Sequence, residues 1–550
     1  MKNKNRDKKF WGVIIVLIII ISAIFVISKR NGSHTGNDNL ISDYLPSEIN
    51  TVDNAKIIDN SSYLIAKNTG EGLLTLNKKG QPVKAQATYY HQSKDGLTWT
   101  FKLRKNLKWS NGDPVTAQNY VYGWQRVVSP KTGSQLTYLF SGIKNANSII
   151  NGKIKNLSSL GIKAVGHYKI VITLEHPEPQ FKQLLTMPFF FPENKKIVEK
   201  YGKKLGSSST KQVYDGPFVL TGWNGSNDHF KLIPNKYYWD KKAVKNSGVS
   251  FQVIKDPIAV LSAYKQGKID QAILTTSQQV AKNKNRNDFH TINLARSYWL
   301  DYNQSKSTSL LRDKKLRKAL DLAINRKALA KEISRGLYKP LKTVSPVSLS
   351  KTPSGDDFAT TAGKVTSYSF NLVKAKRMFS QVLKGSGKKS IVLNLEGVSD
   401  SPQVKSTLDY LAQSWSSLPG LTIKEKIVPQ GKWQQDMQNE NFDIILTSWS
   451  ADYSEPLNYL NMFASGQNNN YTGWSNKAYD QVLEDAINKG NSNSAYRNSQ
   501  EIKAEKMLSQ QTVISPLYSV TEGYLRNSRL KGILIQNDGS EYYKSAYLTK

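Results

Sequence analysis

The sequence predicts an α/β protein of two or three domains that follows an N-terminal membrane-spanning segment. The chain has 550 residues, and single hydrophobic cores stop growing at about 250–300 residues, so more than one domain is expected. From residue 310 to residue 446, helical patterns alternate with strand patterns, which is typical of a partly parallel sheet covered by helices. An unbroken apolar run occupies residues 10–27.

The N-terminal segment predicts export of the rest of the chain. Residues 2–9 carry five basic side chains against Asp7, and the apolar run that follows spans roughly 27 Å as a helix. Because the larger positive charge precedes the run, the N-terminus stays inside. A cleaved signal peptide is the alternative, but the length of the run and the basic pair after it favour an uncleaved anchor helix (residues 1–30) and a polar tether (residues 31–44). We expect the protein at the outer face of the cell membrane.

Composition excludes several classes of function. The chain has 77 Lys and Arg against 42 Asp and Glu, a formal net charge of +35. These basic residues are scattered, whereas nucleic-acid-binding proteins gather them into a tract or stripe, so we expect a solvated basic surface and no nucleic-acid partner. The absence of Cys excludes disulfides, thiolate metal ligands and a lipid-modified N-terminal Cys. The six His are far apart, so no metal site is expected.

Local patterns predict individual elements along the exported part of the chain. A turn at Asp95-Gly96 precedes an alternating strand over residues 97–103, and residues 168–174 form a second such strand. Thr116 is a candidate N-cap of the helix that follows it. Asn371 caps a later helix before a strand at residues 390–395, and the apolar face of this helix consists of Leu372, Ala375, Met378, Phe379 and Val382.

The sequence contains no short motif of an enzyme. Residues 385–390 resemble a phosphate-binding loop, but Val382 occupies the position of its first Gly and Lys389 that of its Ser or Thr. No nucleophile elbow, zinc-protease motif or dinucleotide fingerprint is present. We therefore expect a binding protein without catalytic residues or cofactor, rather than an enzyme.

A set of longer segments carries a family resemblance. The most specific block is residues 95–117. Further matching segments occur in the order in which one known protein family has them: residues 47–53, 71–74, 122–126, 215–218, 238–240, 316–320, 323–326, 442–443 and 449–456. Together they resemble the peptide-binding branch of the bacterial extracellular solute-binding proteins of family 5. The resemblance covers residues 45–550, essentially the whole exported body.

The resemblance implies a two-lobed periplasmic-binding-protein-like fold of type II, of the large cluster C type, with an extra inserted domain. Lobe I (domain I) is then discontinuous, the inserted domain II follows its first segment, and lobe II (domain III) is continuous. In this numbering lobe I takes residues 45–70, 197–302 and 518–550, the insert residues 71–196, and lobe II residues 303–517. The two lobes enclose the ligand by hinge closure.

The resemblance also implies where a peptide binds. The carboxylate that holds the ligand's α-ammonium in the family corresponds to Asp452, although a turn cap before Pro456 is an alternative role. Residues that we expect to line the cleft are Trp449, Ser450, Ala451 and Tyr453, of which Tyr453 has core packing as its alternative. From the first lobe we expect ligand contacts by Asp59 and Ser61.

The predicted function is that of an oligopeptide-binding subunit of an ABC importer. Its partners are oligopeptides, a permease pair with cytoplasmic ATPases, and the membrane through the N-terminal helix, and we expect a monomer. A peptide-pheromone receptor that feeds the same importer is one alternative, and an envelope chaperone or hydrolase is another. Some relatives bind ligand carboxylates through basic residues just before the Asp452 segment; residues 434–437 and 444–446 contain none, so no peptide length is predicted.

Overall fold

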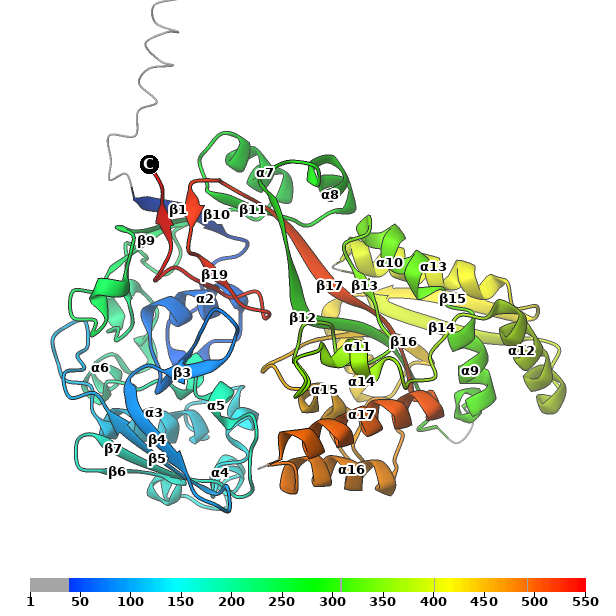
Figure 1. Cartoon of the computed structure of the whole chain (residues 1–550), viewed down its shortest axis with the longest axis horizontal. Helices are drawn as coiled ribbons and strands as arrows, with labels where there is room; N and C mark the ends of the chain where they lie inside the picture. Colours follow the sequence, from blue (N-terminus) through cyan, green and yellow to red (C-terminus); the bar gives the residue numbers. More distant parts are fainter. Residues whose placement is uncertain (1–38, 307–308, 400, 492) are drawn as a thin grey trace, which may run out of the picture.

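The computed structural model describes residues 39–306, 309–399, 401–491 and 493–550, which form two lobes joined by a pair of long strands (Figure 1). The apolar run predicted to span the membrane lies outside these residues. Within the described part of the chain, no helix has both the length and the apolar character that crossing a bilayer requires.

One sheet of the first lobe has four strands in the order β1-β10-β9-β8. β1 (Leu40–Leu45) runs parallel to β10 (Gly248–Val253), whereas β9 (His229–Pro234) and β8 (Phe218–Thr221) continue antiparallel. Every second side chain of β1 is buried, as expected for a strand with one face on a core. The folded body therefore includes residues that were expected in the polar tether, because they alternate as a strand.

A second four-stranded sheet, in the order β4-β5-β7-β6, is antiparallel throughout. β5 (Thr98–Leu103) and β7 (Lys169–Thr173) confirm the two strands predicted from alternating side chains. They pair with each other at the centre, and β4 (Ala87–Gln92) and β6 (Ile162–Val165) form the edges.

Helix α3 (Ala117–Val128) packs on this second sheet and confirms Thr116 as its N-cap residue. Trp124 of α3 is fully buried and meets the rings of Phe140 and Phe190 edge-on, at centroid distances of 5.8 and 5.3 Å. Such aromatic pairs add to the burial of apolar surface. The result is a large hydrophobic core in this part of the chain.

The second lobe contains the predicted parallel strands. β14 (Ile391–Val398) runs parallel to both β15 (Leu421–Val428) and β16 (Ile444–Ser450). The Asn371 side chain accepts a hydrogen bond from the Lys374 N–H at 2.9 Å, which confirms it as a cap. The helix that it starts, α12 (Leu372–Ser386), buries Ala375, Phe379 and Val382 as the apolar pattern predicts.

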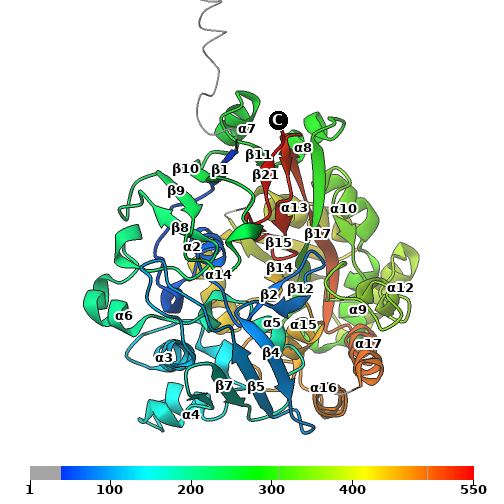
Figure 2. The same ribbon diagram turned by 60° about the vertical axis from the view of Figure 1, so that its left-hand side comes forward.

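Two long antiparallel strands, β12 (Phe289–Tyr302) and β17 (Ile514–Arg526), connect the lobes (Figures 1 and 2). β17 pairs with β11 (Gln271–Leu274) near one end, and β12 pairs with β16 near the other. The register between the two long strands shifts between Asn293 and Ser297. Such irregularities bend a strand and re-aim its side chains, here at the border between the lobes.

The remaining helices and strands are shorter or lie on the outside of these sheets. Their bounds are α2 (Asn60–Thr69), β2 (Leu74–Leu76), β3 (Pro82–Lys84), α4 (Ala146–Ile150), α5 (Phe181–Leu184), α6 (Lys195–Tyr201), α7 (Pro257–Lys265), α8 (Ser277–Asn283), α9 (Lys314–Leu322), α10 (Arg326–Ser334), β13 (Lys339–Pro340), α11 (Phe358–Ala362), α13 (Pro402–Ser416), α14 (Gln430–Gln438), α15 (Leu457–Leu460), α16 (Lys477–Asn488), α17 (Ser494–Gln511), β18 (Leu530–Lys531), β19 (Leu534–Ile535), β20 (Glu541–Tyr542) and β21 (Tyr547–Leu548).

Candidate ligand-binding cleft

A cavity of about 660 Å³ lies where the two lobes face each other. The N-terminal end of α2, the segment around Tyr138 and the loop before β20 line it from one side, and the end of β16 lines it from the other. Five of the residues expected at the site lie in this lining: Asp59, Ser61, Ser450, Ala451 and Asp452. The fold thus brings together residues that are almost 400 positions apart.

The first-lobe residues Asp59 and Ser61 also have local partners. Asp59 is the N-cap of α2: its carboxylate accepts a hydrogen bond from the Ser62 N–H at 2.8 Å and one from the Asn50 side chain at 3.0 Å. The Ser61 hydroxyl donates to the Ser47 carbonyl at 2.9 Å. These hydrogen bonds hold the N-terminal end of α2 in place at the cleft. Part of the hydrogen-bonding capacity of Asp59 and Ser61 is therefore satisfied within the protein.

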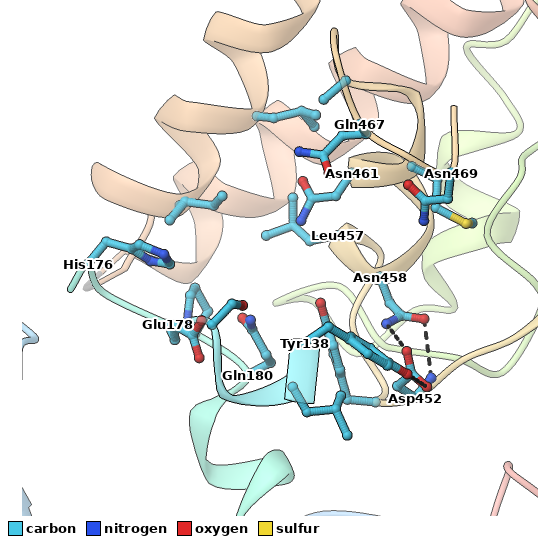
Figure 3. Close-up of a pocket in the computed structure, with 18 of the residues that line it drawn as sticks. Tyr138, His176, Glu178, Gln180, Asp452, Leu457, Asn458, Asn461, Gln467 and Asn469 are labelled. Carbon is cyan, nitrogen blue, oxygen red and sulfur yellow. Dashed lines mark hydrogen bonds between the residues drawn. The ribbon is translucent and has the colours of Figure 1, made fainter. Parts of the chain in front are cut away.

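Asp452 follows the end of β16 and is half-buried between the lobes. Its backbone N–H donates to the Asn458 side-chain oxygen at 3.2 Å, and the Asn458 amide donates back to its carboxylate at 3.3 Å. The Tyr138 hydroxyl reaches the other carboxylate oxygen at 3.5 Å from the opposite lobe (Figure 3). Burial raises the pKa of Asp452 to about 6, although both neighbours act in the opposite direction.

No Lys, Arg or His of the described residues forms a salt bridge with Asp452. Its partners Asn458 and Tyr138 are neutral, so the negative charge of its carboxylate is not compensated. A carboxylate in a partly dehydrated position is stabilised when a cation binds to it. The cleft can therefore hold a ligand ammonium group at this position.

A second cavity, of about 920 Å³, meets the first one at Asp452, which lines both; Figure 3 shows the residues around this second cavity. It lies between residues 138–184 and residues 449–487 and includes Trp449 and Tyr453 in its lining. Tyr453 also packs against the core of the β4–β7 sheet, so its side chain belongs both to the cavity lining and to a hydrophobic core. The neighbouring Ser454 N–H donates to the Gln183 side chain at 2.6 Å, which adds a polar contact across the lobes.

One edge of β16 is free of strand pairing where it borders the cleft. β14 pairs with β16 only at Ile444 and Ile445, whereas β12 pairs with it as far as Ser450. Residues 446–449 instead line a third cavity, of about 460 Å³, together with Trp433 and Tyr471. An unpaired strand edge offers backbone N–H and C=O groups to an extended chain.

Several residues of the site were not predicted from the sequence. Arg296 on β12 donates to the Ser450 hydroxyl at 2.6 Å and lines the 660 Å³ cavity together with Glu522 of β17. Tyr138 and Asn458 bind Asp452. The sequence offered no local signal for Arg296, because β12 also contains polar residues such as His290 and Asp301. The described residues contain no group of His, Asp and Glu side chains arranged to hold a metal ion.

Comparisons with known proteins agree with this geometry. The model of the family "Bacterial extracellular solute-binding proteins, family 5 Middle" matches residues 81–471. A dipeptide-binding protein of Lactococcus lactis subsp. cremoris is 37% identical over 548 residues, which cover 97% of this chain and 99% of that protein.

Solved structures of similar proteins cover nearly the whole chain. OppA of Listeria monocytogenes, solved with a bound peptide, has a TM-score of 0.75 at 32% identity and covers 94% of this chain and 100% of its own. The pheromone receptor PrgZ has a TM-score of 0.76 at 31% identity, with coverage of 93% and 99%. The chain therefore belongs to the bacterial extracellular solute-binding proteins of family 5.

Proposed function

We propose that this protein is the extracytoplasmic oligopeptide-binding subunit of an ABC importer, and not an enzyme. The observation that supports this most is Asp452, a partly buried carboxylate without a cationic partner among the described residues, at the point where two cavities between the lobes meet. Relatives that bind dipeptides or were solved with a peptide favour a peptide as the ligand.

In this proposal the ligand α-ammonium binds to the Asp452 carboxylate. The extended peptide backbone then pairs with the free edge of β16, which is β-augmentation inside a cleft. Residues that contact the ligand from the second lobe are Trp449, Ser450, Ala451 and Tyr453, and those from the first lobe are Asp59 and Ser61. The lobes close on the peptide as domains with the boundaries expected from the sequence.

The closed protein delivers its peptide to a membrane permease pair with cytoplasmic ATPases. The chain acts as a monomer that residues 1–30 hold at the outer face of the cell membrane. A pheromone receptor is the second candidate, because PrgZ covers the chain as fully as the peptide-bound OppA does. The two functions differ in ligand range: an importer subunit binds many peptides, and a receptor binds one.

Native mass spectrometry of the purified protein with a mixed peptide library tests the proposal. Retention of many peptides with free N-termini supports the importer subunit. Retention of a single species from the library, or from culture medium added to it, supports the receptor. If the protein retains no peptide under either condition, the proposed function is wrong.

A further inference from the structure

The two cavities that meet at Asp452 are acidic, although the whole chain is strongly basic. Among the described residues their lining contains nine carboxylates: Asp43, Asp59, Glu178, Asp452, Asp480, Glu484, Glu522, Asp538 and Glu541. The lining contains no Lys and a single Arg, Arg296. Because the chain as a whole has 77 basic against 42 acidic residues, this reversal is local to the cleft and favours cationic ligands.

Glu178 is the most deeply buried of the acidic residues in the 920 Å³ cavity. Only 7% of it is exposed, and none of the hydrogen bonds or ion pairs of the described residues involves its carboxylate. Burial alone raises the pKa of Glu178 to about 7. Burial penalises the ionised form of a carboxylate that no cation balances, so this carboxylate has the properties of a ligand contact.

The surroundings of Glu178 are shaped to hold a carboxylate at this position. Its carboxyl group lies directly against Gly142, where a Cβ atom would overlap it. Amide side chains that can bind further N–H groups line the same cavity (Figure 3): Gln180, Asn458, Asn461, Gln467 and Asn469. The cavity therefore combines the buried carboxylate of Glu178 with neutral hydrogen-bonding groups.

We propose that the Glu178 cavity binds a basic side chain of the ligand, so that the protein selects peptides with Lys or Arg next to a free N-terminus. This inference rests on the proposed function, in which Asp452 fixes the α-ammonium. Asp452 lines both cavities. The side chain of the peptide's first residue therefore enters the Glu178 cavity, while the peptide backbone continues along β16. The cation then supplies the partner that Glu178 lacks within the protein.

Titration calorimetry with matched peptides tests this assignment on the complete protein. Tetra-alanine peptides with a free N-terminus carry either Lys or norleucine, its uncharged analogue, at each position in turn. With Lys at the first position we expect at least about tenfold tighter binding than with norleucine, as for other buried charged hydrogen bonds. At the last position we expect no such preference.

A variant without the negative charge of Glu178 tests whether this residue causes the preference for Lys. Glu178→Gln should remove the preference for Lys, because the Lys peptide loses the carboxylate that binds its cation and the norleucine peptide has no such contact to lose. Glu199→Gln, which removes the same charge from an exposed position of α6, should keep the preference. If the variant Glu178→Gln does not fold, the comparison of the two peptides on the unchanged protein decides by itself.

The outcomes separate this inference from the proposed function. Equal affinities for the Lys and norleucine peptides, or a Lys preference only at positions remote from the N-terminus, would overturn the assignment of Glu178 while the peptide-binding function stands. Failure of all peptides to bind, including those with free N-termini, would overturn both.

Discussion

Asp452, the residue that we propose binds the ligand ammonium group, owes its charge properties to its surroundings. The hydrogen bonds from Asn458 and Tyr138 orient the carboxylate without neutralising it, and burial raises its pKa to about 6. In the absence of ligand the folded state therefore favours the protonated form more than the unfolded chain does. A bound ammonium group reverses this preference, because it stabilises the ionised carboxylate.

Peptide affinity should consequently depend on pH. Protons and the ligand ammonium compete for Asp452, so affinity is highest above its pKa and falls by about tenfold for each pH unit below about pH 6. Calorimetric titration at about pH 5 and about pH 7 with a peptide that lacks basic side chains measures this effect without involving Glu178. In Asp452→Asn the difference should disappear; equal affinities at both pH values in the unchanged protein would contradict it.

Gly142 provides a second test at the scale of a residue. The variant Gly142→Ala places a methyl group where the Glu178 carboxyl group lies, and this group has to move. We expect a smaller affinity difference between the Lys and norleucine peptides, with little change for the norleucine peptide itself. Gly152→Ala is the control, because no atom lies near the position of a Cβ at Gly152. The backbone φ of Gly152 is 71°, so Ala is more strained there, but no contact with Glu178 changes.

At the scale of elements, several residues of the segments that resemble family 5 stabilise the first lobe through buried polar contacts. Tyr238 and Trp239 donate to the buried Glu71 carboxylate, each at 2.5 Å. Arg126 of α3 binds Asp53 at 2.6 Å and Glu193 at 2.8 Å, and all three side chains are nearly inaccessible to solvent. These contacts connect α3 and the segment around Tyr238 to Asp53 and Glu71 in the N-terminal part of the described chain.

Replacing Arg126 should therefore destabilise the protein strongly. Arg126→Leu leaves the Asp53 and Glu193 carboxylates buried without their cation, at a cost of about 3–5 kcal/mol. Arg286, whose guanidinium binds Asp288 at the surface, is a matched control that should cost less than about 1 kcal/mol when replaced by Leu. Urea denaturation followed by circular dichroism compares the two variants, and equal losses would contradict the structural role of Arg126.

The same scale shows what the sequence could predict. Strands β5 and β7 and helices α3 and α12 were predictable because alternation, apolar spacing and caps are local signals. The position of Arg296 was not, because it depends on the pairing of β12 with β16, where Arg296 lies opposite Ser450. Asp452 was predicted as a ligand contact only through the family resemblance, since an Asp before a Pro is equally typical of a turn.

Glu178 shows most clearly what cannot be predicted from the sequence alone. Residues 175–180 of the sequence contain His, two Pro and two Glu, a composition typical of an exposed loop. In the fold Glu178 lies against Gly142 and lines a cavity together with residues 449–487 of the second lobe. Burial created by contacts between distant segments leaves no local signal in the sequence.

At the scale of the whole molecule, β12 and β17 connect the lobes and the cavities lie between them. The register shift of these strands near Arg296 lies beside the cleft, where a change of strand angle would move the lobes relative to each other. Among the described residues, the polar contacts that cross the cleft include those from Tyr138 to Asp452 and from Ser454 to Gln183.

Peptide binding should therefore make the molecule more compact. Small-angle X-ray scattering with and without a saturating peptide is expected to show a smaller radius of gyration in the complex, since the ligand bridges both lobes. The control is the same peptide with an acetylated N-terminus at equal concentration. Identical scattering curves for the free protein and a saturated complex would contradict closure of the lobes.

The most direct test of the central claim is the affinity of Asp452→Asn for one peptide in two forms, with a free and with an acetylated N-terminus. We expect the variant to lose more than about 1.5 kcal/mol of binding free energy for the free form, because the charged hydrogen bond to the ammonium is gone. Its affinity for the acetylated form should hardly change. Equal losses for both forms would contradict the assignment of Asp452 as the residue that binds the peptide N-terminus.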